Sequence, residues 1–473
     1  MSKPQKNVGR VSPKGCENPC GATRQATSAH DDVGLREETA NPTYVGMAGD
    51  WIPSTLADVS SDVSYGYTES ATSDKVGPRF LRITDIQNGV VAWGNVPYCP
   101  ISEANHRKYR LDQGDIVVAR TGNSTGENFL YRGNEDAVFA SYLIRFRVDR
   151  QKAEPAFVWY NLRSVKWWDF INNSKIGSAQ AGANAKILGQ FPIRLPLLTE
   201  QKAIAHILGT LDDKIELNRR MNATLEAMAR ALFQSWFVDF DPVRAKLDGR
   251  QPASLDAATA ALFPAHFQES SLGHIPQGWE VRSLDQVADY LNGLALQKYP
   301  PGDGETLPVI KIAQLRKGDS EGADRCNTDL ASQYVVEDGD VLFSWSGSLE
   351  VELWCGGRGA LNQHLFKVTS SDFPKWFYYL WTLYHLDEFR LIAADKATTM
   401  GHIQRGHLTA AKVLVPPPVL LESMTRIMAP LIDQIIANRA QSRTLATLRN
   451  ALLPMLLSGD IRVPNVENEV ASV

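Results

Sequence analysis

The amino-acid sequence predicts an α+β protein in which one globular unit occurs twice, each time followed by a long helix. The segment Tyr109–Gly122 returns as Tyr334–Gly347, an offset of 225 residues. Upstream of it, Trp51 returns as Trp279 at an offset of 228, and a helical block downstream returns at an offset of 220. Three blocks in the same order indicate a duplicated domain, because a solenoid repeat is only ~20–50 residues long.

Each copy contains short runs of β-branched and aromatic residues that are bounded by Gly, Asn and Asp, a pattern typical of strands. A helical pattern with an aromatic face follows, from Pro155 to about Asn172 in the first copy and after Pro374 in the second. We therefore expect mixed α/β domains. The predicted strands begin at Phe80, Asp115 and Ser141 in the first copy and at Val309, Asp340 and His364 in the second.

A long helix with heptad spacing closes each copy. After Pro196, Thr199 can cap the first of these helices and Glu200 suits its positive N-terminal end. Apolar residues then recur at alternating steps of four and three, so we expect the two helices to pair as an antiparallel coiled coil. The predicted pairing residues are Leu211, Ile215, Asn218 and Leu225 in the first helix and Leu431, Ile435, Asn438 and Leu445 in the second.

Asn218 and Asn438 occupy seam positions near the middle of the two helices. A polar residue at an apolar seam costs stability, and its best-attested use is to fix register. Because the midpoints of antiparallel helices face each other, we expect these side chains to hydrogen-bond across the seam. The alternative is that both are tolerated polar positions on separately packed helices.

The domain boundaries follow from these patterns. Residues 1–45 are polar and lack apolar periodicity, so we expect a disordered N-terminal extension. The rest divides into a first domain (46–197), a first helical spacer (198–240), a linker (241–274), a second domain (275–417), a second helical spacer (418–460) and a tail (461–473).

The composition excludes several protein classes. No apolar run approaches ~18 residues, and the N-terminus lacks the ~7–15-residue apolar core of a secretory signal, so we expect a cytoplasmic protein without a membrane span. The five cysteines are scattered and odd in number, which argues against a disulfide framework. With a formal net charge of −4, any contact to nucleic acid must come from local clusters of side chains.

The sequence also lacks the common catalytic motifs. There is no phosphate-binding P-loop, no nucleophile elbow, no zinc-protease motif and no Asn-Pro-Pro-Tyr-type methyltransferase motif. Gly122–Gly126 is rich in glycine, but no clear helix follows it, so a hairpin turn is the better interpretation. Cys16, Cys20 and His30 lack a fourth ligand for zinc. We therefore predict no catalytic residue and no metal site, and a role in binding and assembly.

The helical block Leu198–Phe240 resembles that of the specificity subunits of type I restriction–modification systems. It places Glu-Gln-Lys-Ala-Ile-Ala ahead of Leu-Asp-Asp-Lys-Ile-Glu-Leu-Asn and ends in Leu-Phe-Gln-Ser-Trp-Phe. Ile275–Trp279 resembles the opening of a target-recognition domain in that family, and Leu456–Arg462 resembles its usual close. The resemblance covers about Gly49–Val463, although the leader is unusual and the second helix lacks the Glu-Gln pair.

The resemblance implies a non-catalytic subunit of a complex that methylates and cleaves DNA. Each domain would recognise one half of an asymmetric bipartite target in double-stranded DNA. The helices would set the spacing and dock two methyltransferase subunits, and motor–nuclease restriction subunits would complete the complex. S-adenosylmethionine, ATP and Mg would belong to those partners, so no cofactor is expected in this chain. Two alternatives stay open, namely a methyltransferase or nuclease acting alone and an assembly scaffold that binds no DNA.

Candidate DNA contacts lie in polar and basic loops, because Arg, Lys, Asn and Gln make most contacts to bases and phosphates. Any one of these residues could be a solvated surface group. Taken together, however, they recur at matched positions with different side chains, as readers of two different half-sites should. The candidates are Arg120, Asn123, Ser124, Lys175, Gln180, Asn184 and Lys186 in the first copy and Lys396, His402, Gln404 and Arg405 in the second.

Overall fold

The computed structural model describes residues 51–175, 182–253, 255–395 and 401–463. The predicted N-terminal extension and most of the predicted tail lie outside these residues. None of the helices within them is long and apolar enough to cross a membrane.

Both domains are built from short strands. Those of the first domain are β1 (Ile52–Thr55), β2 (Ser60–Tyr65), β3 (Arg79–Leu81), β4 (Asp115–Ala119), β5 (Asn128–Leu130), β6 (Ala137–Phe139), β7 (Leu143–Val148) and β8 (Pro192–Leu195). Those of the second domain are β11 (Glu280–Ser283), β12 (Asp289–Asn292), β13 (Thr306–Ile310), β14 (Arg325–Asn327), β15 (Val335–Val336), β16 (Val341–Ser344), β17 (Val351–Leu353), β18 (Gly359–Leu361), β19 (Leu365–Thr369) and β20 (Lys412–Val415).

The two domains share one sheet topology. The first contains a four-stranded antiparallel sheet in the order β2-β7-β4-β5, and the second contains the same sheet in the order β12-β19-β16-β17. The parallel pair β3–β6 is matched by β13–β18, which β14 and β15 extend to four strands, and the antiparallel pair β1–β8 is matched by β11–β20. The duplication that the sequence predicts is therefore confirmed in the topology.

Short helices pack on the sheets of both domains. In the first domain they are α1 (Glu103–Tyr109), α2 (Pro155–Asn161), α3 (Val165–Lys175) and α4 (Ala185–Gly189). In the second they are α8 (Leu284–Val287), α9 (Ile312–Lys317), α10 (Lys375–Tyr384), α11 (Leu386–Asp395) and α12 (Arg405–Ala410). Single 3-10 turns occur at Gln87–Gly89, Trp93–Asn95, Leu296–Lys298 and Ser332–Tyr334.

The aromatic pattern after Pro155 is two helices, α2 and α3, and not the single helix that the sequence predicts. The break falls at Ser164, whose hydroxyl donates to the carbonyl of Asn161 at 2.7 Å and accepts from the backbone N–H of Trp167 at 3.3 Å. A serine that bonds the backbone in this way ends one helix and caps the next. The second domain has the same division, between α10 and α11.

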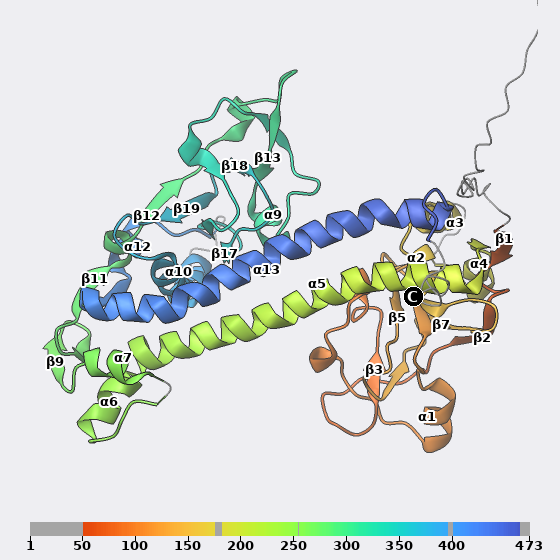
Figure 1. Ribbon diagram of the computed structural model, residues 1–473, viewed down its shortest axis with the longest axis horizontal. Helices are drawn as coiled ribbons and strands as arrows, with labels where there is room; N and C mark the ends of the chain where they lie inside the picture. The colour runs from red at the N-terminus through yellow and green to blue at the C-terminus, as the bar shows by residue number, and fades with distance from the viewer. Residues whose placement is uncertain (1–50, 176–181, 254, 396–400, 464–473) are drawn as a thin grey trace, which may run out of the picture. The chain divides into compact units, whose positions relative to one another are not determined.

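Two long helices, α5 (Leu198–Phe233) and α13 (Pro418–Ser458), lie side by side (Figure 1). A π-helical turn, Gln234–Val238, extends α5. The helices are antiparallel, because Arg449 pairs with Asp212 whereas Arg439, earlier in α13, pairs with Glu226, later in α5. The antiparallel pairing is thus observed, and a supercoiled geometry remains a prediction.

The predicted cap at Thr199 is wrong. The N-cap lies two residues earlier, at Leu197, whose side chain provides no hydrogen bond, and the helix begins at Leu198. The side chain of buried Gln201 instead donates to the carbonyl of Pro196 at 2.9 Å and accepts from the backbone N–H of Glu154 at 3.0 Å. The start of the helix is therefore fixed by a contact with the first domain, which no local pattern reveals.

The buried asparagines form a polar layer between the helices, but the side chains of Asn218 and Asn438 do not bond to each other as expected; of the groups of Asn438, Asn218 Nδ2 donates only to the backbone carbonyl, at 3.4 Å. Asn438 Nδ2 donates to Asn222 Oδ1 at 2.9 Å, and Asn218 Nδ2 donates to Gln441 Oε1 at 2.9 Å and to Ser442 Oγ at 3.2 Å. The partners are displaced because a seam side chain enters a hole between residues of the facing helix and does not meet its own counterpart. Asn222 and Ser442 occupy equivalent positions in the internal repeat. The contact of Asn438 with Asn222 is therefore the counterpart of the contact of Asn218 with Ser442.

The heptad seam packs against three surfaces in turn. Its first residues, Ile204 and Leu208, belong to the core of the first domain, and its last, Ala229 and Trp236, belong to the core of the second. Its middle faces α13, whose residues also enter both cores. Among the predicted pairing residues Asn218, Ile435 and Asn438 are buried, and Leu211, Ile215, Leu225, Leu431 and Leu445 are half-buried.

The predicted linker 241–274 is structured. It forms α6 (Asp241–Leu247), α7 (Ala257–Leu262) and a hairpin of β9 (Phe267–Ser270) and β10 (Gly273–Pro276). Val243 and Phe263 are fully buried in the core of the second domain. These apolar side chains were too few and too widely spaced to give a periodic signal, so their burial depends on the domain that they join.

Candidate nucleic-acid interface

In each domain the loop after a central strand is joined to the segment that leads into a short helix. In the first domain the backbone N–H of Ala183, ahead of α4, donates to the carbonyl of Arg120 at 2.9 Å. In the second the N–H of Ile403, ahead of α12, donates to the carbonyl of Trp345 at 3.0 Å. The structure thus brings the two groups of predicted contacts together in the first domain, and in the second it joins the predicted segment to the matching loop, at the same end of the sheet.

Arg120 lies between two tyrosines at this end of the first sheet. Its Nε donates to the carbonyl of Ser141 at 3.0 Å. Its guanidinium carbon is 5.2 Å from the ring centroid of Tyr65 and 5.9 Å from that of Tyr142. Both rings are exposed, by 44% and 56%. These tyrosines were not among the predicted contacts, and the available signal was an aromatic residue at the end of a short strand.

Gly122–Gly126 is a hairpin turn, as predicted, because it connects the antiparallel strands β4 and β5. Gly122 and Gly126 have φ values of +69° and +98°, which favour glycine. Asn123 is exposed at the tip, and Ser124 Oγ accepts from Gln87 Nε2 at 3.2 Å. The turn therefore offers one exposed amide to a ligand and is no phosphate-binding loop.

Asn184 has a structural role. Its Oδ1 accepts from the backbone N–H of Ile187 at 2.9 Å and caps α4. Lys186 is exposed on the same short helix, and Lys175 ends α3. Gln180 lies outside the described residues. Of the predicted contacts in this segment, only Lys186 is thus seen as an exposed cation.

We expect Asn184→Ala to lower the free energy of unfolding by about 1 kcal/mol, because it removes a helix cap. Asn184→Ser keeps a capping oxygen and should restore most of that loss. Urea unfolding of the full chain measures both. A normal stability for Asn184→Ala combined with loss of one DNA half-site would show that the side chain reads DNA and that its capping bond is dispensable.

An indole occupies the place of Arg120 in the second domain. Trp345 Nε1 donates to Asn292 Oδ1 at 2.9 Å, and the ring centroid lies 6.0 Å from that of His364 and 6.4 Å from that of His402. His402, which the sequence predicts as a contact, thus belongs to an aromatic group at the end of the sheet. Trp345 and His364 were not among the predicted contacts, and the internal repeat was the available signal for them.

The remaining predicted contacts of the second domain surround α12. Gln404 is its N-cap, and the Gln404 backbone N–H donates to His407 Nδ1 at 3.0 Å. Arg405 Nη2 donates to the carbonyl of Tyr290 at 3.1 Å, and its guanidinium lies 5.8 Å from the ring centroid of Phe366. Both Gln404 and Arg405 are exposed. Lys396 lies outside the described residues.

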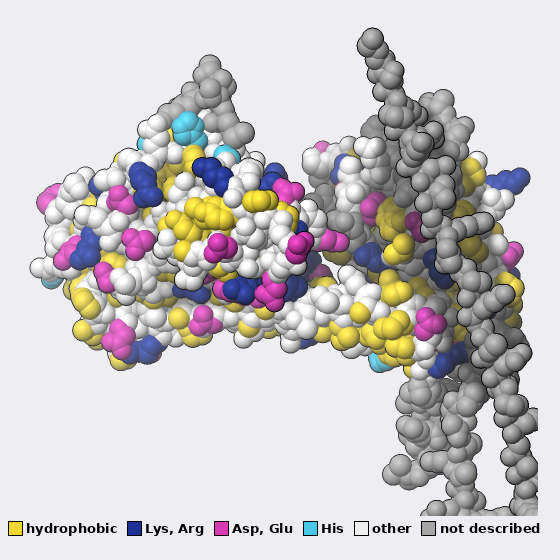
Figure 2. All heavy atoms as spheres, turned by 90° about the horizontal axis from the view of Figure 1, so that it is seen from above, with side chains coloured by type: hydrophobic (Ala, Val, Ile, Leu, Met, Phe, Trp, Pro, Cys, Tyr) yellow, Lys and Arg dark blue, Asp and Glu magenta, His cyan; other side chains and the backbone are white. Residues whose placement is uncertain are grey.

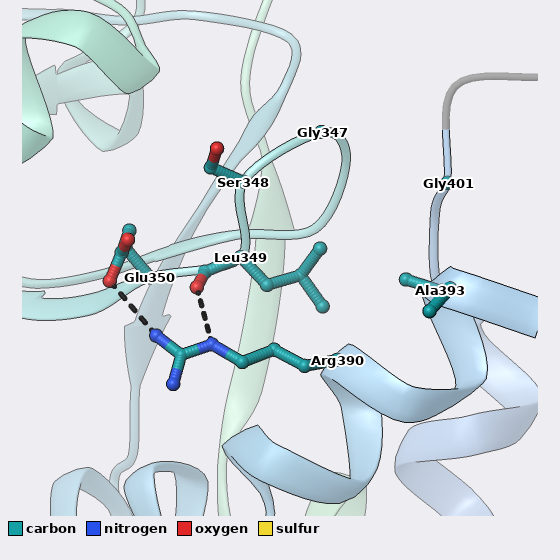
Figure 3. A pocket seen from close by; sticks show the side chains of 8 residues that line it. Gly347, Ser348, Leu349, Glu350, Arg390, Ala393 and Gly401 are labelled. Atoms are coloured by element: carbon teal, nitrogen blue, oxygen red, sulfur yellow. Dashed lines mark hydrogen bonds and ion pairs between the residues drawn. The ribbon is translucent and has the colours of Figure 1, made fainter. Parts of the chain in front are cut away.

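An open pocket of about 610 Å³ lies beside the loop after β16 (Figure 3). Arg390, from α11, donates from Nε to the carbonyl of Leu349 at 3.2 Å and from Nη2 to Glu350 at 3.1 Å. Its third contact is Asp387, at 3.0 Å. The cation is thus already neutralised, and it anchors this loop to the helix.

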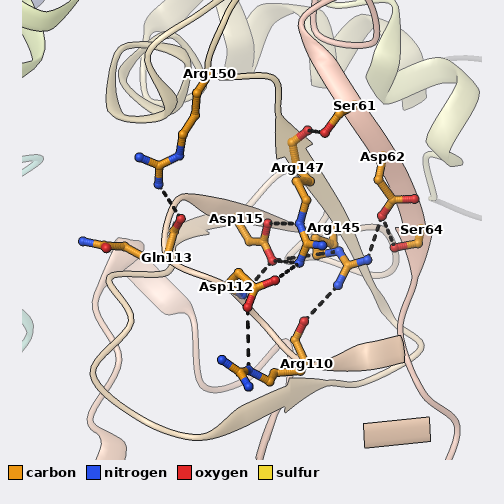
Figure 4. A network of polar contacts seen from close by, with 10 residues as sticks. All are labelled: Ser61, Asp62, Ser64, Arg110, Asp112, Gln113, Asp115, Arg145, Arg147 and Arg150. Carbon is orange, nitrogen blue, oxygen red and sulfur yellow. Dashed lines mark hydrogen bonds and ion pairs between the residues drawn. The ribbon is translucent and has the colours of Figure 1, made fainter. Parts of the chain in front are cut away.

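The other end of the first sheet holds a network of paired charges (Figure 4). Arg147 donates from Nε and Nη2 to the two carboxylate oxygens of Asp115, each at 2.8 Å, and Arg145 Nη2 pairs with Asp62 at 2.7 Å. Burial acts to raise the pKa of Asp62, but its hydrogen bonds, first that from Arg145, outweigh burial and hold the pKa below its usual value. These arginines tie β2, β4 and β7 together.

A further pair of this network, Arg145 Nε and Asp115 Oδ2 at 4.0 Å, is repeated in the second domain with a different cation. Lys367 Nζ lies 2.7 Å from Asp340 Oδ2, and these residues occupy the positions of Arg145 and Asp115 in the repeat. Lys367 also donates to the carbonyl of Val335 at 2.9 Å, as Arg145 does to that of Arg110. Because both domains retain this ion pair, we infer that it stabilises the shared fold and does not contribute to the recognition of a particular DNA sequence.

The surface charges are mixed in sign. Figure 2 shows acidic and basic side chains interspersed on the face that it presents, without a large basic patch. Within the described residues, no group of three His, Cys, Asp or Glu side chains could hold a metal ion. A contact with nucleic acid would therefore depend on individual side chains at the sheet ends.

A family model described as "Type I restriction modification DNA specificity domain" matches residues 50–227 and 276–445. The MjaIX specificity subunit of Methanocaldococcus jannaschii is 24% identical over 363 residues, which are 75% of this chain and 76% of that one. The HindI specificity subunit of Haemophilus influenzae is 22% identical and covers 87% of this chain and 100% of its own. A crystal structure of a type I S subunit from M. genitalium has a TM-score of 0.51 at 14% identity, covering 86% and 96%, and so has a similar fold.

Proposed function

This chain belongs to the family of type I restriction–modification DNA specificity subunits, and on that premise we propose that its two domains read an asymmetric bipartite target in duplex DNA. One observation carries this proposal. The two domains have the same sheet topology, yet they present different side chains at equivalent positions of the sheet end, with Arg120 in one and Trp345 in the other. Two domains that share a fold but present different side chains are suited to recognising two different half-sites.

The helices would set the distance between the half-sites. Tyr160 of the first domain donates to Asp212 of α5 at 2.8 Å, and Trp376 of the second donates to Thr425 of α13 at 3.0 Å. Each domain is thus anchored to the first half of the helix that follows it, while its core also includes the end of the other helix. A fixed separation of two readers corresponds to a fixed spacing of half-sites.

The catalytic work would belong to partners. We infer that methyltransferase subunits, with restriction subunits in the complete complex, bind this chain and carry S-adenosylmethionine, ATP and Mg. Leu217, Met221 and Met228 are exposed on α5 at helical spacing. Such an exposed apolar stripe is typical of a surface that another protein covers.

Methylome sequencing tests the proposal. A host that carries the whole operon should show one bipartite methylated motif, and deletion of this gene should remove it. Persistence of every bipartite motif after deletion would refute the proposal. Two further assays address the alternatives: methyl transfer to DNA by the purified chain alone would identify an independent enzyme, and a footprint without protected half-sites would favour a scaffold.

A further inference from the structure

We propose that Arg120 reads a guanine in the first half-site, while the equivalent position of the second domain reads without a cation. The inference rests on the proposed function and names a residue that determines its specificity. The two positions are equivalent by hydrogen bonding as well as by sequence offset. The N–H of Arg120 donates to the carbonyl of Tyr142 at 3.1 Å, and the N–H of Trp345 donates to that of His364 at 3.3 Å.

The guanidinium of Arg120 is held but not neutralised. Its Nε bond to Ser141 and the rings of Tyr65 and Tyr142 restrict its orientation. No hydrogen-bond or ion-pair partner occupies Nη1 or Nη2 among the residues that the structure describes. Other arginines of this domain differ, since Arg82 and Arg147 are paired with aspartates.

These properties match the requirements of base recognition. Two donors in a fixed planar fork fit the O6 and N7 acceptors of guanine, which is the commonest specific contact to DNA. A side chain whose rotamer is already fixed loses little entropy when it binds. Arg120 therefore has the geometry of a sequence reader more than that of a mobile phosphate contact.

The second domain cannot make this contact at the equivalent place. The only polar hydrogen of the Trp345 side chain is donated to Asn292, so the indole offers a ring surface and no free donor. His364 and His402 lie beside it. The two domains thus have the same backbone arrangement at this position but present different side chains, a guanidinium in the first and an indole in the second.

The test uses the complex assembled with its methyltransferase subunits, and variants Arg120→Gln and Arg120→Lys. We expect the methylated motif to keep its second half-site and its spacing, while one guanine of the first half-site loses preference. Discrimination at that position should fall about 5- to 150-fold in binding assays, because one bidentate contact is lost. Arg107→Gln, an exposed arginine on α1, is the matched control and should leave the motif unchanged.

Base analogues make the assignment specific. Replacing the guanine by 7-deazaguanine should weaken the parent complex but have no further effect on Arg120→Gln. A uniform loss of affinity for all duplexes, with a smaller salt dependence, would assign Arg120 to a phosphate and overturn the proposal. An unchanged motif with both variants would also overturn it. If the parent complex itself gave no bipartite motif, the proposed function would be the one that fails.

Discussion

Inserting four residues into both long helices, after Ile215 in α5 and after Leu445 in α13, should lengthen the spacer of the DNA target by about two base pairs. Both sites lie between the anchors of the first domain and the polar layer around Asn218 and Asn438. Four residues add about 6 Å to a helix and slightly more than one turn, so the seam continues with little rotation. At ~3.4 Å per base pair, 6 Å is close to two steps.

Methylome sequencing of the reassembled complex measures the spacer directly, and both half-sites should keep their sequences. The same insertion in the exposed turn at Gly249, between α6 and α7, lengthens the chain without separating the anchors and should leave the spacer unchanged. An insertion into α5 alone should impair assembly, because it displaces Asn222 from Asn438. An active double-insertion complex with the original spacer would show that the helices do not set the distance.

Phe237→Ala should lower the free energy of unfolding of the second domain by about 3–5 kcal/mol, the usual cost of removing a buried phenylalanine ring. Phe237 is 2% exposed, and its ring centroid lies 5.3 Å from that of Trp279 and 5.6 Å from that of Trp381. It follows α5 in the chain, within the turn that extends this helix, yet it is buried in the core of the other domain.

Met228→Ala on the same helix is the matched control, because this side chain is 47% exposed and should change stability by about 0.5 kcal/mol or less. Urea unfolding followed by tryptophan fluorescence should show an earlier transition of the second domain in Phe237→Ala, with the first domain unaffected. Equal curves for the two variants would mean that the end of α5 does not support the second domain. The two domains require separate analysis, since a multidomain chain need not unfold in one step.

The outline of the fold could be predicted from the sequence because it depends on local periodicity and on the internal repeat, and the family could be predicted because the helical block Leu198–Phe240 resembles that of known specificity subunits. Strands near Asp115 and Asp340 alternate or run apolar over a few residues, and the heptad spacing after Pro196 continues over many turns. Such patterns report which side of an element is buried. They are sufficient for the duplicated sheet, the two long helices and their antiparallel arrangement.

Only the tertiary structure decided what each buried side packs against. The seam of α5 gives no sign that its ends enter two different cores, or that the side chain of Asn438 bonds to that of Asn222 and not to that of Asn218. Nor does the sequence place Tyr65 and Tyr142 beside Arg120, because the three come from strands that are far apart in the chain and adjacent in the sheet. A periodic pattern fixes orientation within one element, whereas a site depends on contacts between elements, which only the folded chain brings together.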